Sequence, residues 1–300
     1  MTPEPSLFES RNAGPLFESR NAGPLFGSRK TRPLSVSHAA GSTFESHEAG
    51  PLTGGLAGPF RLIDLTLPTP EENLACDEAM LALSEERGTS GILRFWEPRT
   101  SFVVVGYSGS VAEEAYVDRC KEEGVPILRR FTGGGTVLQG PGCLDYALVL
   151  PIAMHSALET ITGTNRFVMQ RLRGAIASLL PPQAPLGVNG GTDLTFDRWK
   201  VAGSGQRRGI SHLLFHGVIL LELDLPQIGR LLPMPARRPE YRKGRPHEEF
   251  VRNLGLPAAS VKRAIAHAWG AGEETVDIPP ARITSLVDSR YALSSWNFRK

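Results

Sequence analysis

Three successive glycines, Gly133, Gly134 and Gly135, are the feature of this 300-residue chain best suited to binding a ligand. They directly follow a strand-like run, so their backbone can approach a ligand closely and expose amide groups to an anion. Arg129 and Arg130 stand just before them and can supply charge-assisted hydrogen bonds to a phosphate or carboxylate. No Gly-Lys-Ser/Thr follows and no Gly-x-Gly-x-x-Gly opens a helix, so neither a Walker loop nor a dinucleotide fingerprint is present. On these residues alone, a glycine-rich hairpin with two solvated arginines is an equally good interpretation.

A second feature is Lys200, which lies between an expected tight turn at Asp197 and Arg198 and the small-residue run Val-Ala-Gly-Ser. A lysine at that place is held by a sheet rather than by a loose loop. Such a fixed cation can stabilise negative charge that develops during a reaction. The alternative is an ordinary solvated lysine, which is by far the commoner case for a lysine in a strand.

Cysteine usage, charge and hydropathy exclude several classes of protein. Cys76, Cys120 and Cys143 are odd in number and far apart, so they predict neither a disulfide framework nor a structural zinc cluster. The formal net charge of +2 at pH 7 gives no strong electrostatic footprint for nucleic acid. No run approaches the roughly 20 apolar residues of a membrane-spanning helix, and the start of the chain lacks a secretory signal. We therefore expect a soluble, cytoplasmic protein that binds neither nucleic acid nor membrane.

Residues 1–58 differ in kind from the rest of the chain. A nine-residue unit recurs there, and Leu-Phe-Glu-Ser-Arg-Asn-Ala-Gly-Pro occurs twice in succession, from Leu7 and from Leu16. The unit is shorter than a solenoid repeat and is broken by Gly-Pro, so we interpret residues 1–58 as a disordered, repetitive tail. A docking arm with a repeated Leu-Phe anchor, or an upstream repeat included through a misplaced start codon, would give the same pattern.

Residues 59–300 have the pattern of one folded domain in which strands dominate. Strands are expected at 61–65, 92–96, 102–107, 126–130, 146–151, near 194 and 200, and at 213–223. Helices are expected from about 68 to 83, 112 to 123 and 165 to 179. This order, with several hairpin-like adjacencies, predicts an α/β or α+β fold with a mixed β-sheet flanked by helices, and not a doubly wound parallel sheet.

Taken together, these motifs resemble the catalytic domain of the biotin and lipoate protein ligase family. The matching pieces, in chain order, are Glu72-Asn73-Leu74-Ala75, Arg94-Phe95-Trp96, Val105-Gly106, the Arg-Arg-x-Thr-Gly-Gly-Gly stretch from Arg129, Asp193-Leu194, Lys200-Val201-Ala202-Gly203-Ser204 and Phe215-His216-Gly217. The similarity covers the chain from Phe60 to its carboxyl end. It is closest to the lipoate-protein ligase A branch, some members of which share the run Gln-Gly-Pro-Gly-Cys-Leu and a basic Tyr-Arg-x-Gly-Arg-x-His segment, here beginning at Tyr241. The resemblance implies a catalytic domain like those of class II aminoacyl-tRNA synthetases and biotin synthetase.

For function, the resemblance implies a two-step reaction. ATP with Mg²⁺ and a lipoate or octanoate carboxylate give an acyl-adenylate, which a lysine of a lipoyl domain or of a glycine-cleavage H-type protein then attacks. Lys200 is the implied catalytic cation beside the α-phosphate and the carbonyl oxygen. Asp193 could hold a magnesium ion or a ribose hydroxyl, and for His216 the plainer interpretation is a packed histidine. The residues implied in binding the substrate or the adenylate are Arg129, Arg130, Thr132, Gly133, Gly134, Gly135, Asp193, Gly203, Ser204 and His216.

Two departures from the family pattern affect these expectations. Little sequence follows the catalytic portion, so we expect the usual carboxyl-terminal accessory domain to be absent and a separate accessory subunit to take its place. Thr192 stands where the ligases often have Asn, which weakens a metal-binding role for the neighbouring Asp193.

The alternative function is an ATP-independent octanoyl or lipoyl transferase that works through a cysteine thioester. The regions in which transferases place that cysteine, 186–191 and 231–234, contain none, so Cys143 is the remaining candidate nucleophile. A small apolar residue packed after a glycine turn is the plainer interpretation of Cys143. A binding module that keeps the fold without catalysis is a third hypothesis, and biotin ligase is disfavoured by the apolar stretches and the Gln-Gly-Pro-Gly-Cys-Leu run.

Overall fold

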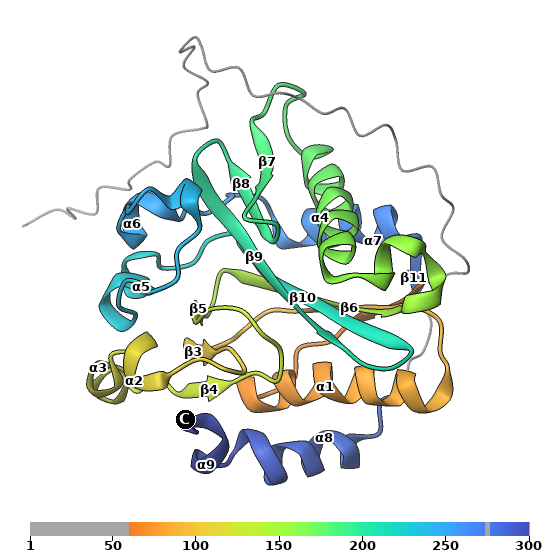
Figure 1. Cartoon of the computed structure of the whole chain (residues 1–300), viewed down its shortest axis with the longest axis horizontal. Coiled ribbons are helices and arrows are strands. Elements are labelled where there is room, and N and C mark those ends of the chain that lie inside the picture. Colours follow the sequence, from red (N-terminus) through yellow and green to blue (C-terminus); the bar gives the residue numbers. More distant parts are fainter. Residues whose placement is uncertain (1–59, 274–276, 300) are drawn as a thin grey trace, which may run out of the picture. The chain divides into compact units, whose positions relative to one another are not determined.

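The computed structural model describes residues 60–273 and 277–299. Within these residues, eight strands form one mixed sheet in the order β11-β1-β2-β6-β10-β9-β8-β7 (Figure 1). β1 pairs in parallel with β2 and β11, and the other neighbours pair antiparallel. The strands are β1 Phe60–Asp64, β2 Ile92–Trp96, β6 Cys143–Pro151, β7 Leu186–Asn189, β8 Asp193–Phe196, β9 Trp199–Arg208, β10 His212–Leu220 and β11 Ala271–Glu273. The predicted fold class, a mixed sheet flanked by helices, is confirmed.

A second sheet of three strands has the order β4-β3-β5. Its strands are β3 Phe102–Val105, β4 Ile127–Arg129 and β5 Val137–Gln139, with β3 parallel to β4 and antiparallel to β5. The expected strand at 102–107 therefore ends two residues early. The carbonyl groups of Gly106 and Tyr107 accept hydrogen bonds from the Arg129 side chain instead of continuing the ladder.

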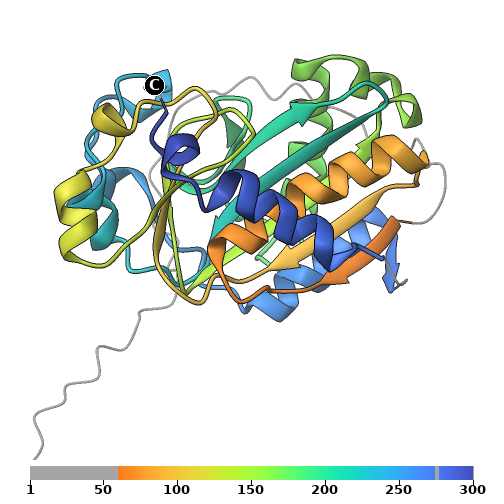
Figure 2. The same ribbon diagram turned by 90° about the horizontal axis from the view of Figure 1, so that it is seen from below.

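Helices cover both faces of the large sheet. α1, Pro70–Arg87, lies against one face, and α4, Ile161–Ala177, and α7, Ala258–Trp269, lie against the other (Figure 1). Thr69 begins α1 with a capping box, in which its hydroxyl accepts from the N–H of Glu72 and the Glu72 carboxylate accepts from the N–H of Thr69. Figure 2 shows α8, Pro280–Leu286, running alongside α1.

β6 separates two apolar cores. Leu148 and Leu150 pack with residues of α4 and α7, whereas Ala147 and Val149 pack with residues of α1 on the opposite face. Side chains alternate between the faces of a strand, so burial on both faces gives the unbroken apolar run that the sequence shows here. Asp145 belongs to the α1 side by this alternation.

The remaining helices are short. The expected helix at 112–123 is two pieces, because Ala115 is extended (φ −143°, ψ 143°) and the N–H of Tyr116 donates to the carbonyl of Leu231. The expected helix at 165–179 begins earlier, at Ile161, where the Thr160 hydroxyl caps it. The short elements are α2 Val111–Glu114, α3 Val117–Glu122, α5 Pro226–Leu231, α6 His247–Phe250, α9 Ser294–Asn297, the 3-10 turns η1 Ile152–Met154, η2 Ser156–Glu159 and η3 Glu240–Arg242, and the π-helical turn η4 Val287–Tyr291.

Two expectations concern the whole chain. In the two described ranges, no helix is both long enough and apolar enough to cross a membrane. The interpretation of residues 1–58 as a disordered tail falls outside the described residues and stays a prediction.

Candidate active site

A cavity of about 300 Å³ lies where the α1 side of the large sheet meets the small sheet and the glycine loop. Its walls are largely apolar, which suits a hydrocarbon chain. The cavity also takes in the basic segment that the sequence singled out, through Arg237, Arg242 and His247. Its apolar wall residues are Leu74, Trp96, Val104, Val137, Leu138, Val218, Leu220, Ile228, Leu232, Phe250 and Val251.

The floor of the cavity is a row of residues, each paired with a residue of the next strand. The row crosses four inter-strand spacings. The row runs Trp96, Asp145, Val218, Gly203, Asp193, and each of these residues lines the cavity. Directly paired residues of antiparallel strands point to the same face, so the row is continuous. Neighbouring strands lie about 4.8 Å apart, and two such spacings separate Asp145 from Gly203. The distance between these two residues is therefore roughly 10 Å, which is about the length of an extended medium-chain acid.

A β-bulge brings Lys200 onto this floor. The pairing of β8 with β9 shifts between Leu194 and Thr195, so that Asp193 pairs with Gly203 but Thr195 pairs with Lys200. Without the shift, Lys200 would point to the other face, because faces alternate along a strand. Gly203 makes room for it, since a Cβ there would lie 2.8 Å from Lys200 Nζ.

The Lys200 ammonium is fixed by Asp193. Lys200 Nζ lies 2.7 Å from Asp193 Oδ1, and the hydroxyl of Tyr241 donates to Asp193 Oδ2 at 2.6 Å. Burial, followed by the neighbouring Asp193 carboxylate, raises the pKa of Tyr241, so this hydroxyl remains a donor. The backbone is fixed as well, because the N–H of Arg252 donates to the Lys200 carbonyl at 2.9 Å. Lys200 is thus a positioned cation in the cavity wall.

Arg130 shapes the glycine loop from beneath. Its guanidinium donates to the carbonyl oxygens of Gly133 and Gly135, each at 2.8 Å, and to that of Val104 at 3.2 Å. Burial lowers the pKa of Arg130 to about 10, and Glu114 opposes the shift, so the group stays charged at neutral pH. Gly134, at φ 98°, adopts a conformation that favours glycine. Arg130, Gly134 and Gly135 all line the cavity.

Arg129 lies outside the cavity lining. Its guanidinium donates to the carbonyl oxygens of Gly106, Tyr107 and Gly109 and to those of Trp296 and Arg299. Burial lowers its pKa. The geometry gives Arg129 a structural role that joins the loop after β3 to the carboxyl-terminal segment, which differs from the ligand contact that the sequence suggested.

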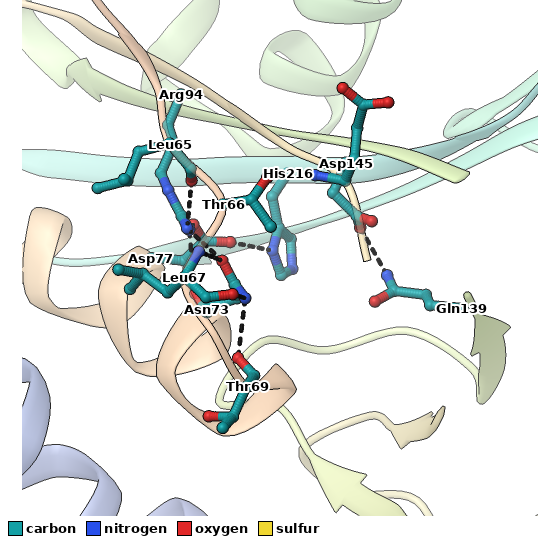
Figure 3. A network of polar contacts seen from close by, with 11 residues as sticks. Leu65, Thr66, Leu67, Thr69, Asn73, Asp77, Arg94, Gln139, Asp145 and His216 are labelled. Carbon is teal, nitrogen blue, oxygen red and sulfur yellow. Dashed lines mark hydrogen bonds and ion pairs between the residues drawn. The ribbon is translucent and has the colours of Figure 1, made fainter. Parts of the chain in front are cut away.

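His216 belongs to a polar network in the neighbouring row of the sheet. Its Nε2 lies 2.6 Å from the hydroxyl of Thr132 and its Nδ1 lies 3.5 Å from Asp77 Oδ2. Asp77 in turn pairs with Arg94 at 2.6 Å, and Arg94 also donates to Asn73 (Figure 3). Of these residues only His216 lines the cavity, so Thr132 contacts the site through the His216 imidazole. Ser204 also contributes to the lining, and its hydroxyl bonds that of Tyr146 at 2.7 Å.

The cysteines are free and buried. Cys143 packs among apolar side chains such as Val218 and Leu223, and burial raises the pKa of its thiol, as does the nearby Asp145. Burial raises the pKa of Cys76 to about 11 and that of Cys120 above its ordinary value. Among the described residues that line the cavity, none is a cysteine.

Within the described ranges, no group of three or more His, Cys, Asp or Glu side chains is placed to hold a metal ion. Both oxygens of Asp193 are engaged, one by Lys200 and one by Tyr241. This carboxylate therefore fits the positioning of Lys200 better than the coordination of magnesium.

Three residues in or beside the cavity were not predicted as part of the site from the sequence. Tyr241 was recognised as part of a basic segment but not as a partner of Asp193, from which 48 positions separate it. Asp145 carried a signal of its own, because it is a lone acidic residue in an apolar strand. Gln139 bonds Asp145, and the only hint of it was its place just after the glycine loop.

The site is thus an apolar cavity with a positioned lysine in its wall, beside a glycine loop on a mixed sheet. The family model of the lipoyl protein ligase A/B catalytic domain matches residues 69–265. The chain belongs to this family. The predicted family and the prediction of a lipoate-protein ligase-like enzyme are thereby confirmed.

The relatives include both chemical branches of the family. The chain is 26% identical to a putative lipoate-protein ligase A of Aeropyrum pernix, over 77% of this chain and 89% of the relative. It is 27% identical to the octanoyltransferase LipM of Brevibacillus brevis, over 80% of this chain and 99% of the relative.

Solved structures share the fold. A bipartite lipoate protein ligase from Thermoplasma acidophilum, described with its E2 lipoyl domain, aligns with a TM-score of 0.68 at 23% identity, over 80% of this chain and 96% of that one. A lipoate-protein ligase A bound with ATP aligns with the same TM-score and identity, over 80% of this chain and 99% of that one.

Proposed function

We propose that this chain activates lipoate or octanoate with ATP as an acyl-adenylate and transfers the acyl group to a lysine of a lipoyl domain. The observation that carries the proposal is the Lys200–Asp193 pair in the wall of an apolar cavity whose described lining holds no thiol. A fixed cation stabilises the charge that develops on the carbonyl oxygen and the α-phosphate during both steps. Arg130, the loop from Gly133 to Gly135, Gly203, Ser204 and His216 would bind the acyl group or the adenylate around it.

The second candidate function is the thioester transfer performed by octanoyltransferases such as the Brevibacillus relative. It needs a thiolate beside the acyl carbonyl. Cys143 would have to ionise in an apolar cluster that raises its pKa, and it lies outside the cavity lining. The ligase reaction requires no cysteine, so it agrees better with this geometry.

The partners follow from the reaction and from the relatives. A lipoyl domain is the proposed acceptor, with a glycine-cleavage H-type protein as a second one. The bipartite ligase of Thermoplasma supports a separate accessory subunit. ATP is supported as co-substrate by the related ATP-bound ligase. Mg²⁺ would enter as the ATP complex, since the described residues provide no cluster of metal ligands. We propose that the protein works in the cytoplasm.

One assay separates the two functions. Purified full-length protein is incubated with an apo lipoyl domain and either free octanoate with ATP and Mg²⁺ or an octanoyl-carrier protein without ATP. Acylation of the lipoyl domain is followed by intact mass. The ligase predicts transfer from the free acid that depends on ATP. Transfer from the carrier protein alone would establish the transferase. Each reaction is repeated with the Thermoplasma-type accessory subunit. The lack of a required subunit would prevent only the ATP-dependent reaction with free octanoate.

A further inference from the structure

Lys200 lies at the end of the cavity that solvent reaches. Its side chain is 24% exposed, whereas Asp145, near the other end of the row of paired residues, is buried. In the proposed reaction the acceptor lysine must reach an acyl carbonyl beside Lys200. The acceptor therefore approaches from this end, and its surface has to lie against the residues that surround Lys200.

The exposed residues around Lys200 include four cations. Arg198 lies in the turn before β9, and the N–H of Arg252 donates to the Lys200 carbonyl at 2.9 Å. The other two belong to the segment 237–245, which reaches the site through the Tyr241 hydroxyl. The four cations are exposed and lie outside the cavity lining. We call them the basic rim: Arg198, Arg238, Lys243 and Arg252.

Positive charge is concentrated in the segment 237–245. Its nine residues include five basic and one acidic, although the whole chain is nearly balanced, with 33 basic and 31 acidic residues. Within the described ranges, no residue of the basic rim forms an ion pair. Burial lowers the pKa of Arg242, and the nearby Arg238 and Arg245 lower it further. Like charges gathered without carboxylates repel one another, so a negatively charged partner would stabilise them.

The segment is held in place by its own hydrogen bonds. Arg245 donates to four carbonyl groups, one of them that of Arg198, so it joins the segment to the turn before β9. Lys243 has φ 49°, a left-handed conformation that favours glycine, and such strained residues are concentrated at functional sites. A surface whose charges are already positioned loses little conformational freedom when a partner binds.

We propose that the basic rim docks an acidic face of the acceptor domain, with carboxylates on both sides of the lysine that is acylated. This rests on the proposed function, which places the acyl carbonyl at Lys200. ATP is the other polyanion of that reaction. A nucleotide bound inside the cavity would lie against its lining, whereas the rim residues lie outside that lining. A protein surface laid across the opening would contact them, and complementary charge would select the acceptor.

Direct binding without acid or ATP tests the proposal. Isothermal titration calorimetry compares two forms of one apo lipoyl domain, with glutamate or with glutamine on both sides of the target lysine, against the full chain. We expect the glutamate form to bind roughly tenfold more tightly at low salt. This advantage should shrink as salt is added, because exposed charges are screened. Equal binding of the two forms, or no measurable binding of either, would overturn the proposal.

A double variant assigns the preference to the rim. Arg238→Glu combined with Lys243→Glu should abolish the preference for the glutamate form. The matched control is Arg166→Glu combined with Arg263→Glu, which makes the same change of charge at exposed residues of α4 and α7, on the sheet face opposite α1. The control should keep the preference. If the rim variant does not fold, as judged by thermal unfolding, the milder pair Arg238→Gln and Lys243→Gln replaces it. A preference that survives in the folded variant would contradict the assignment.

Octanoate-dependent exchange of pyrophosphate into ATP separates the acceptor from the nucleotide. The rim variant should exchange at the wild-type rate, because the acceptor takes no part in adenylation. A rim variant that loses exchange but binds the acceptor normally would assign the rim to ATP and overturn the proposal. The proposed function fails separately, if the wild type shows no exchange even with the accessory subunit, and the binding comparison still decides whether the rim docks an acidic acceptor.

Discussion

Lys200 and Asp193 form an ion pair across a β-bulge, with Nζ 2.7 Å from Oδ1, and the pair lies in the cavity wall. The bulge decides which face of the sheet Lys200 lies on, because a shift of one residue in register moves a side chain from the cavity to the other face. Tyr241 holds the second carboxylate oxygen, so the charge of Lys200 is fixed in direction as well as in place.

Lys200→Ala should abolish acyl transfer while the fold persists. Removing a positioned charge from a developing oxyanion typically costs a factor of about 100 to 1,000 in rate. Lys262→Ala is the matched control, because Lys262 also forms ion pairs, with Asp64 and Glu97, but lies outside the cavity lining. Initial rates and thermal unfolding of both variants would be compared. Turnover within tenfold of wild type in Lys200→Ala would remove Lys200 from the mechanism.

Tyr241→Phe should lower kcat by about tenfold, the effect of losing one hydrogen bond to a charged group. Tyr241 acts through Asp193, so KM for the acid should change little while kcat falls. A merely structural role would lower stability without this split between kcat and KM. Tyr116→Phe, at an exposed tyrosine, is the control.

Arg129→Lys should destabilise the fold by at least about 1 to 3 kcal/mol, the usual cost of leaving a buried hydrogen-bonding group unsatisfied. Lysine lacks the planar guanidinium group with which Arg129 donates hydrogen bonds to five carbonyl groups. Arg230→Lys, at a half-exposed arginine, should change the free energy of unfolding by less than about 1 kcal/mol. Urea unfolding measures both. If the Arg129→Lys protein is stable but binds the acid poorly, Arg129 contributes to ligand binding and not to stability.

Cys143→Ala should keep most of the acyl transfer, because an acyl-adenylate reaction uses no thiolate. Stability should fall only modestly, since alanine leaves a small cavity where the thiol packed. Intact-mass analysis after incubation with an octanoyl donor gives the direct readout. A stable acyl adduct on the wild type that is missing from Cys143→Ala would establish the transferase chemistry instead.

The sequence predicted the features that depend on local pattern. The glycine loop, the place of Lys200 in a strand and the strand at 146–151, which is part of β6, all follow from residue type and periodicity. It could not predict the bulge beside Thr195, because a register shift depends on both strands of a pair. Arg129 and Arg130 are adjacent residues of the same type, but their contacts differ. Arg129 donates hydrogen bonds to the carboxyl-terminal segment, whereas Arg130 donates to the glycine loop. That division depends on β3 and α9, which are distant in sequence, and no local signal contains it.

The stability of the fold should depend on pH through Asp145. Its pKa is raised in the folded protein, chiefly by burial, so its favourable contribution is complete below the unfolded value of about 3.9 and is lost as pH rises toward the folded value. As pH rises above the unfolded value, the unfolded chain ionises this carboxyl more readily than the folded chain does, which favours unfolding increasingly. Asparagine cannot ionise and keeps an acceptor for Gln139, so Asp145→Asn should gain stability relative to wild type as pH rises from 4 to 8.

Urea unfolding of wild type and Asp145→Asn at intervals from pH 4 to pH 8 measures this difference. Asp64→Asn, at an exposed carboxylate that forms an ion pair with Lys262, should instead be slightly destabilised at pH 7. A gap between wild type and Asp145→Asn that does not change with pH would show that Asp145 is ionised in the folded protein.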